Sequence, residues 1–151
     1  MRQNMLVHAP GFSLIELLIS ITIIGIILAY ALPALQAHLL TARRIEAINL
    51  LYDAASHQAR FRLQNHRYAS FAELTASPPA GPGMATRNRY YRLSLTLTAG
   101  NAGYVAQATV EPGAAQARDQ KCWSFTLDNV NRRTASNKAA DDNTRACWRQ
   151  D

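Results

Sequence analysis

The sequence predicts an α+β fold in which a long N-terminal helix packs on an antiparallel sheet of three or four strands. Three observations lead to this fold class. Residues 17–42 carry no formally charged side chain, residues 43–65 keep a helical spacing of apolar residues, and residues 91–136 alternate apolar and polar side chains between turn signals. With 151 residues, the chain has room for one domain of ordinary size.

The chain is basic, with a formal net charge of +6. A charge of this size favours acidic partners, such as nucleic acid, anionic lipid or an acidic cell surface. The arginines are scattered along the sequence, however, which is equally typical of a solvated protein surface. Charge alone therefore leaves the partner open.

The N-terminal apolar stretch is long enough to span a membrane, since about 20 apolar residues suffice for a helix. Glu16 lies near its start, where a carboxylate is costly unless it has a partner or a function. A simpler role for Glu16 is to favour the helix dipole. The small residues of Ala29-Tyr30-Ala31 offer a secretory cleavage site. The length of the apolar stretch and its acid argue against that cleavage.

The segment Gly11-Phe12-Ser13-Leu14-Ile15-Glu16 resembles the class III signal of type IV prepilins. The resemblance implies that a membrane peptidase cuts between Gly11 and Phe12 and methylates the new N-terminus at Phe12. Glu16 becomes the fifth residue of the mature chain and neutralises the N-terminal ammonium of a neighbouring subunit. Opposite charges about 4 Å apart in a low dielectric attract by several kcal/mol, so such a pair would fix the register of the polymer.

Two further positions fit the resemblance, and one departs from it. Gly25 and Pro33 lie where the family has helix-weakening residues, and Gly and Pro cost about 1 and 3 kcal/mol inside a helix. The family often has Lys or Arg before the glycine, but this chain has Ala9-Pro10, which puts efficient processing in doubt. Arg2 keeps some positive charge on the cytoplasmic side.

The resemblance and the patterns together divide the chain. We expect a cleaved leader at 1–11, a transmembrane and polymerisation helix at 12–35, an amphipathic continuation at 36–65, and a globular head at 66–151. The residues expected to face the sheet share i, i+3, i+4 spacing: Ile45, Ile48, Leu51, Tyr52, Ala55, Ala59 and Leu63. The residues expected on the polar face are Arg43, Arg44, Glu46, Asn49, Asp53, Gln58, Arg60 and Gln64.

The head is expected to contain an irregular αβ-loop (66–89), a β-meander (90–136) and a C-terminal loop (137–151). Ser70 is a candidate cap for a short helical turn ending near Leu74, and residues 77–83 are too rich in Pro and Gly for regular structure. The expected strands are residues 91–97, 104–110 and 122–127, with a weaker fourth at 132–136. Such a sheet would bury one face on the helix.

The two cysteines, Cys122 and Cys147, fit a disulfide if the head is exported, and their spacing does not suggest zinc. Their bond would pin the polar tail to the sheet. The resemblance agrees, because type IV pilins fasten a C-terminal loop, the D-region, in this way. The segment 106–127 and the ending Cys147-Trp148 look like the short PilE-type minor pilins.

The resemblance implies a structural subunit, a minor rather than a major pilin, in a fibre that serves motility, adhesion or DNA uptake. Its partners would be other pilins, the prepilin peptidase, the platform protein and the assembly ATPase. The subunit would wait in the inner membrane of a Gram-negative bacterium with its head in the periplasm, then enter an extracellular pilus.

Two other readings stay open. A DNA-binding pilin would use candidate nucleic-acid contacts in the C-terminal part, namely Arg132, Arg133, Lys138, Arg145, Arg149 and Trp148. A type II secretion pseudopilin would depend on calcium, for which Asp141-Asp142-Asn143 offers oxygens, although a polar turn explains that segment equally well.

The sequence shows no pattern that predicts an enzyme. His8, His38, His57 and His66 are dispersed, and Asp53 and His57, spaced i, i+4, are more typical of a solvated pair. No GxSxG, HExxH or phosphate-loop motif is present. We therefore expect no catalytic residues, no cofactor and no metal site.

Overall fold

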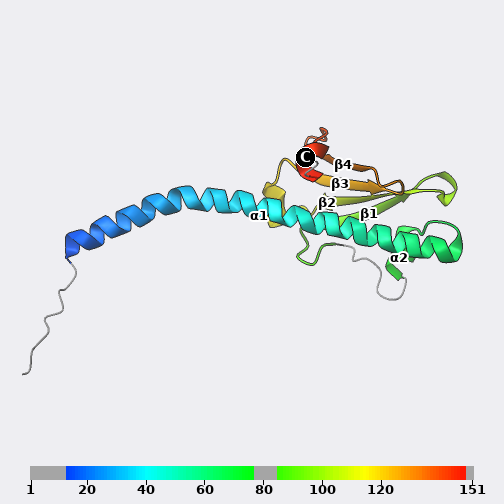
Figure 1. Ribbon diagram of the computed structural model, residues 1–151, viewed down its shortest axis with the longest axis horizontal. Helices are drawn as coiled ribbons and strands as arrows, with labels where there is room; N and C mark the ends of the chain where they lie inside the picture. The colour runs from blue at the N-terminus through cyan, green and yellow to red at the C-terminus, as the bar shows by residue number, and fades with distance from the viewer. Residues whose placement is uncertain (1–12, 77–84, 149–151) are drawn as a thin grey trace, which may run out of the picture. The chain divides into compact units, whose positions relative to one another are not determined.

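A computed structural model of the chain describes residues 13–76 and 85–148 (Figure 1). Its longest element is helix α1, Leu14–Asn65, which runs through Pro33 without interruption. The predicted helix is thus confirmed from Leu14 onward. Within the apolar stretch, the Ser20 and Thr22 hydroxyls each donate to the carbonyl four residues earlier, at 2.8 Å. These bonds satisfy both hydroxyls without water, as a membrane-spanning helix requires.

Two compact units divide the chain, Met1–His38 and Leu39–Asp151. In the first unit every described residue is exposed. α1 is also the one described helix that is long and apolar enough to cross a membrane, and its apolar window is unburied within the chain. The second unit, called the head from here on, holds the hydrophobic core, whose buried members lie between Ala47 and Trp148.

The face of α1 that packs on the sheet differs from the predicted one. The buried helix residues are Ala47, Leu50, Leu51, Ala54 and Gln58. Of the seven predicted core positions only Leu51 is fully buried, while Ile45 is 54% exposed and Leu63 is 82% exposed. The covered face is rotated from the predicted one but overlaps it, since Leu51 belongs to both and Ile48 and Ala55 are partly buried against the core.

Gln58, which the sequence placed on the polar face, is fully buried. Its side-chain amide donates to the Ala69 carbonyl (2.8 Å) and accepts from the Ala69 N–H (2.9 Å). A side chain thus replaces the missing backbone partner of an extended segment, which satisfies both buried peptide groups. This clamp fastens the beginning of the αβ-loop to α1.

Helix α2, Phe71–Ala76, begins with the predicted cap. Ser70 Oγ accepts from the Glu73 N–H (3.3 Å), and Glu73 Oε2 accepts from the Ser70 N–H (2.8 Å). This reciprocal pair is a capping box. It positions Leu74, which is fully buried. The predicted irregular segment 77–83 lies outside the described residues.

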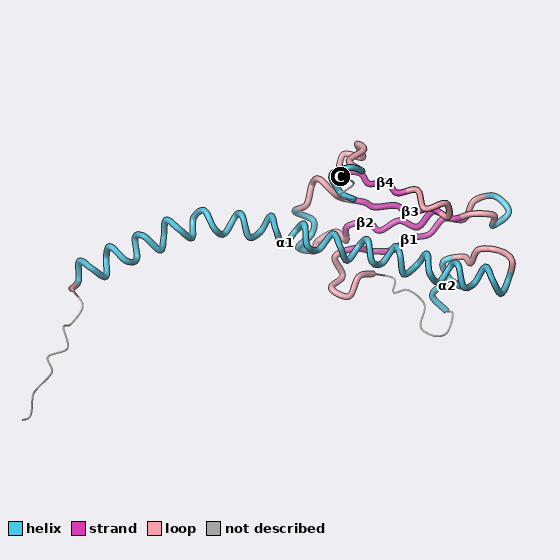
Figure 2. Tube along the Cα trace, viewed as in Figure 1, coloured by secondary structure: helices cyan, strands magenta, loops and turns pink. Residues whose placement is uncertain are grey.

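The sheet is an antiparallel meander in the order β1-β2-β3-β4 (Figure 2). Its strands are Tyr91–Leu97, Tyr104–Val110, Ser124–Asp128 and Arg133–Ser136. The first two strands confirm the predicted bounds. The third strand begins at Ser124 rather than at the predicted Cys122. The fourth begins at Arg133 rather than Arg132, because residues 128–132 form a turn in which the Arg132 N–H donates to the Asp128 side chain (2.8 Å).

Three further short helical segments complete the described elements. They are η1 (Ala99–Asn101), η2 (Ala115–Arg118) and α3 (Thr144–Trp148). Between η1 and β2, Gly103 packs so closely on the β3–β4 turn that a Cβ atom would lie 2.6 Å from Asn129 Oδ1. A larger residue at this position would have to displace the Asn129 and Thr98 side chains. The sequence did not predict α3.

Candidate nucleic-acid interface

The C-terminal segment is fixed to the sheet by the predicted disulfide, which joins Cys122 and Cys147 with a Cα–Cα distance of 5.7 Å. The bond connects the residue two positions before β3 to helix α3. Two hydrogen bonds lie beside it: Asn143 Nδ2 donates to the Lys121 carbonyl (3.0 Å), and the Lys138 N–H donates to the Gln120 carbonyl (3.1 Å). Lys138 and the loop that follows β4 are thereby held against the 120–122 segment.

Asp119 anchors this segment to helix α1. It is 3% exposed and forms a bidentate ion pair with Arg44, with contacts of 2.7 and 2.9 Å. Its other oxygen contacts include the N–H groups of Lys121 and Cys122, at 3.2 and 3.3 Å. Burial, followed by the charge of Asp119, raises the pKa of Tyr91. In the sequence, Asp119 belongs to the segment that resembles short PilE-type minor pilins, but its pairing with Arg44 was not predicted because the two residues are 75 positions apart.

Trp148 is not available to stack on a base, contrary to the sequence prediction. It is 7% exposed, and its indole N–H donates to the Thr134 carbonyl (2.9 Å). Edge-on contacts with Tyr52 and Phe125, at 6.3 and 5.9 Å between ring centroids, complete its surroundings. Because the disulfide holds α3 against the sheet, Trp148 is part of the core.

Trp123 is a partly exposed tryptophan that sequence reasoning overlooked. The Lys138 ammonium lies 5.2 Å from its ring centroid. The Trp123 N–H donates to the Ser136 carbonyl (2.8 Å), which extends the β3–β4 ladder by one bond. An aromatic ring and a cation are thus paired at the end of strand β4. The sequence offered one signal for this residue, since Trp123 directly follows Cys122 of the predicted disulfide.

The predicted cations differ in their surroundings. Arg132 is exposed in the turn before β4, with its Nε 3.7 Å from Asp128 Oδ2. Lys138 and Arg145 are exposed, and neither has an ion-pair partner among the described residues. Arg133 instead lies over the rings of Tyr52 and Trp148, at 5.8 and 5.7 Å. Arg149 lies outside the described residues.

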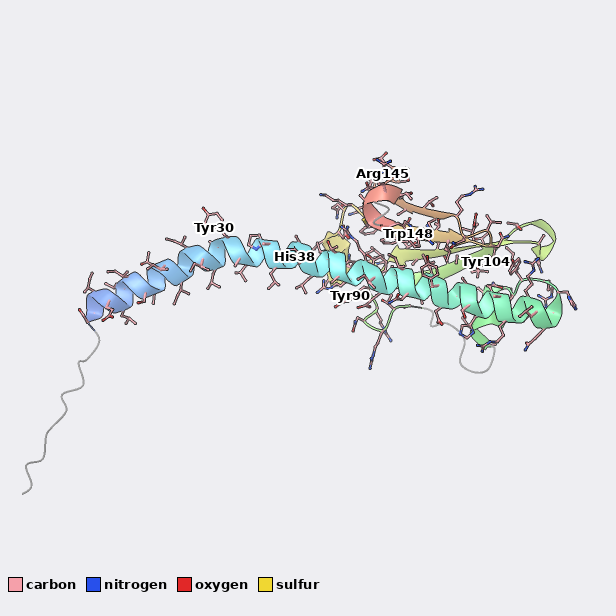
Figure 3. All side chains as sticks on the ribbon, in the orientation of Figure 1. Tyr30, His38, Tyr90, Tyr104, Arg145 and Trp148 are labelled. Atoms are coloured by element: carbon pink, nitrogen blue, oxygen red, sulfur yellow. A yellow bond between two sulfur atoms is a disulfide. The ribbon has the colours of Figure 1, made fainter. Side chains whose placement is uncertain are left out.

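We call Arg132, Lys138 and Arg145, together with Trp123, the β4-edge surface. Arg132 precedes the edge strand β4 and Lys138 follows it, so their Cα atoms are separated by up to about 20 Å at 3.3 Å per residue. Arg145 lies on α3, and Figure 3 shows it beside Trp148. Exposed cations along a strand edge can contact successive phosphates of a nucleic acid, and a partly exposed aromatic ring can stack on a base.

Two carboxylates lie near this surface. Asp141 accepts from the Asn137 side chain (3.0 Å), and Asp142 accepts from the Thr144 N–H (3.2 Å) and hydroxyl (2.5 Å). The hydrogen bonds from the Thr144 side chain and then its backbone lower the pKa of Asp142. These bonds form a polar turn. Of the two interpretations of residues 141–143, a calcium site and a polar turn, they favour the turn.

The residues predicted to take part in processing and assembly belong to the first unit. Gly11 and Phe12 are outside the described residues, whereas Glu16 lies in the first turn of α1. Gly25 and Pro33 are both helical. In the second unit, His57 Nε2 lies 3.7 Å from Asp53 Oδ1, an i, i+4 pair on the helix surface. No further acid or base joins this pair to form a catalytic group among residues 13–76 and 85–148.

Two family models match the chain. The model of the prokaryotic N-terminal methylation motif covers residues 8–32. A methylation motif, a long helix on an antiparallel meander and a disulfide-bounded C-terminal loop together define a type IV pilin, a structural protein rather than an enzyme. The second model covers residues 33–126, which is more than half of the chain, and the chain belongs to its family, described as type IV minor pilin ComP, DNA uptake sequence receptor.

A solved structure, described as the high-resolution structure of a type IV pilin from Shewanella oneidensis, is also similar. The two chains share 22% sequence identity with a TM-score of 0.46, over 62% of this chain and 89% of the other. No curated protein matches the chain.

Proposed function

We propose that this minor pilin is a DNA receptor displayed on a competence pilus. The observation that carries the proposal is the match over residues 33–126 to the family described as a DNA uptake sequence receptor. The basic charge and the β4-edge surface support it, since exposed cations release counterions from the nucleic acid when they bind its phosphates. The proposal therefore ranks DNA binding above motility or adhesion as the role of this subunit.

Biogenesis follows from the N-terminal motif. Prepilin peptidase would cut between Gly11 and Phe12 and methylate Phe12, and the subunit would wait in the inner membrane with its head in the periplasm. The assembly ATPase and platform protein would then transfer it to an extracellular fibre. There Glu16 would pair with the N-terminal ammonium of a neighbouring pilin, and Gly25 and Pro33 would let the helix adapt to the bundle.

On the β4-edge surface, Arg132, Lys138 and Arg145 would contact phosphates while Trp123 lies against a sugar or base. Arg133 has a different role: stacked on Tyr52 and Trp148, it holds β4 against α1. The buried ion pair of Asp119 and Arg44 fixes the segment on which the Lys138 loop rests. Phosphate contacts position a protein on DNA without reading sequence, so we assign affinity rather than specificity to these cations.

The proposal is tested with the full chain in detergent micelles, by measuring its affinity for duplex DNA at several salt concentrations. Three phosphate contacts predict a slope of log affinity against log salt of about −3. The variant Arg132→Gln/Lys138→Gln/Arg145→Gln should lose most of this affinity and flatten the slope. The matched control, Arg43→Gln/Arg87→Gln/Arg89→Gln, removes the same charge elsewhere and should retain both.

The outcomes are distinct. Absence of binding by the unaltered chain at low salt would refute the receptor function. Equal losses in both triple variants would instead refute the β4-edge location, because binding would then depend on total charge alone.

A further inference from the structure

A second group of cations gathers where the head begins. Residues 17–42 carry no charge, so Arg43 is the first charged residue after the apolar stretch. A membrane that holds the apolar stretch must therefore have its headgroups near the first turns of the second unit, around Leu40–Glu46. Residues packed against these turns would face the lipid surface.

Two segments of the head flank these turns. From the αβ-loop, the Tyr90 ring lies 4.7 Å from the Arg43 guanidinium, and Asn88 donates to Glu46 Oε1 (2.9 Å). From η2 and the residues after it, Gln116 donates to the Leu40 carbonyl (3.1 Å), and Asp119 holds Arg44. Both segments are thus fixed beside the start of the head.

Each segment presents exposed cations. Arg87 and Arg89 are exposed in the first, and Arg118 and Lys121 in the second. None of the four, nor Arg43, has an ion-pair partner among residues 13–76 and 85–148. We call these five residues the basal collar. Of the neighbouring carboxylates, Asp119 pairs with Arg44, and Glu46 accepts one hydrogen bond from the neutral Asn88 amide.

The turn that carries Arg87 and Arg89 is rigid. Thr86 is 6% exposed, its carbonyl accepts from the Arg89 N–H (2.8 Å), and its hydroxyl accepts from the N–H groups of Tyr90 and Tyr91 (2.9 and 3.1 Å). Arg89 is held at φ 54°, a conformation that costs a non-glycine residue free energy. The backbone positions of Arg87 and Arg89 are therefore fixed relative to the start of the second unit.

We propose that the basal collar binds the phosphate headgroups of anionic lipids while the pilin is stored in the membrane. Guanidinium groups match phosphate oxygens in geometry, and clusters of Lys and Arg beside a membrane-spanning helix attract anionic lipid. Tyr90 adds an amphipathic ring of the kind found at membrane interfaces. Figure 3 shows Tyr90 and Arg145 on opposite sides of α1, so the collar's αβ-loop side is separate from the β4-edge surface.

This inference does not depend on DNA binding. The test uses the full chain reconstituted in bilayers of equal parts phosphatidylglycerol and phosphatidylcholine, extracted with its surrounding lipid by an amphipathic polymer. Mass spectrometry then measures the lipid ratio around the protein. The unaltered chain should enrich phosphatidylglycerol about two-fold or more, and 1 M NaCl should abolish this enrichment because the Debye length falls to about 3 Å.

Two triple variants serve as a matched pair. Arg43→Gln/Arg87→Gln/Arg89→Gln removes three of the five collar cations and should lose most of the enrichment, whereas Arg132→Gln/Lys138→Gln/Arg145→Gln should keep it. Intact disulfide and unchanged circular dichroism confirm that both variants fold. The proposal is overturned if the unaltered chain shows no enrichment or if both variants lose it equally. It is also overturned if the collar variant keeps the enrichment, whatever its DNA affinity.

Discussion

The two halves of helix α1 share one backbone geometry but have different surroundings. Between Leu14 and His38 the described side chains are exposed, including large apolar ones such as Ile24, at 54%. Between Leu39 and Asn65 the helix contributes five buried residues to a core made by its own chain. The head therefore has an internal source of stability, whereas the first half depends on lipid or on other subunits.

This comparison predicts where substitutions affect folding and where they affect assembly. Changes in the head should alter its unfolding free energy without moving the chain out of the membrane. Changes in the first half should leave head stability unaltered and alter only the partners of the helix. The predictions below run from the largest expected effect on the head to the smallest.

Trp148→Ala should destabilise the head most, by about 3–5 kcal/mol, because it removes a buried ring and leaves the Thr134 carbonyl without its donor. Urea unfolding of the chain in micelles, followed by fluorescence, measures the loss. Trp123→Ala, at the partly exposed tryptophan, should cost less than half as much. Equal costs would mean that Trp148 is not part of the core.

The double variant Cys122→Ser/Cys147→Ser should cost about 3.5 kcal/mol, the chain-entropy estimate for a loop of 25 residues. Reduction of the unaltered chain should give a similar loss. Both treatments should leave the membrane-bound fraction unchanged, because no cysteine lies in the first half of α1. A loss below 1 kcal/mol would show that α3 stays docked through packing alone.

Leu51→Ala and Leu63→Ala distinguish the covered face of the helix from the uncovered one. Leu51 is fully buried and its truncation should cost about 2–4 kcal/mol, whereas Leu63 is 82% exposed and its truncation should cost under about 0.5 kcal/mol. The same urea titration compares them. A large cost at Leu63 would restore the face predicted from the sequence.

The smallest effect is a pH dependence at the start of α2. The side-chain hydrogen bond from Arg67, with others from Ser70, lowers the pKa of Glu73 to about 2. A carboxyl with a lowered folded pKa stabilises the fold above its unfolded pKa, about 4.3, and this stability is lost as the pH falls toward 2. The melting temperature of Glu73→Gln should therefore change less than that of the unaltered chain between pH 5 and about 2. Parallel curves would contradict the assignment.

Local patterns in the sequence predicted the elements that local physics determines. Alternating residues gave β1 and β2 with their observed bounds, and the Ser70–Glu73 spacing gave the cap of α2. The buried face of α1 could not be determined from periodicity, because the sheet decides which side of the helix is covered. Helix α3 and the burial of Trp148 also escaped prediction, since a short polar tail becomes ordered only when the disulfide brings it to the sheet.

Residue type and position in the sequence did not suffice to predict which residues form the candidate nucleic-acid interface. Lys138, Arg145 and Arg132 are exposed as a binding surface requires, but Arg133 is engaged with two rings and Trp148 is in the core. No sequence motif marked Trp123 or the collar arginines as candidate binding residues. Their roles arise from residues far apart in the sequence, as when Arg43 meets Tyr90.

The central claim concerns the first half of α1, Leu14 to His38, whose side chains are exposed. We propose that this half binds neighbouring pilins and that Glu16 makes the decisive contact. The direct measurement is the fraction of Glu16→Gln protein found in sheared pili relative to the membrane, with Glu46→Gln, an acid in the head, as control. We predict that Glu16→Gln remains in the membrane and is nearly absent from pili, while Glu46→Gln enters pili normally. Equal incorporation of the two variants would contradict the claim.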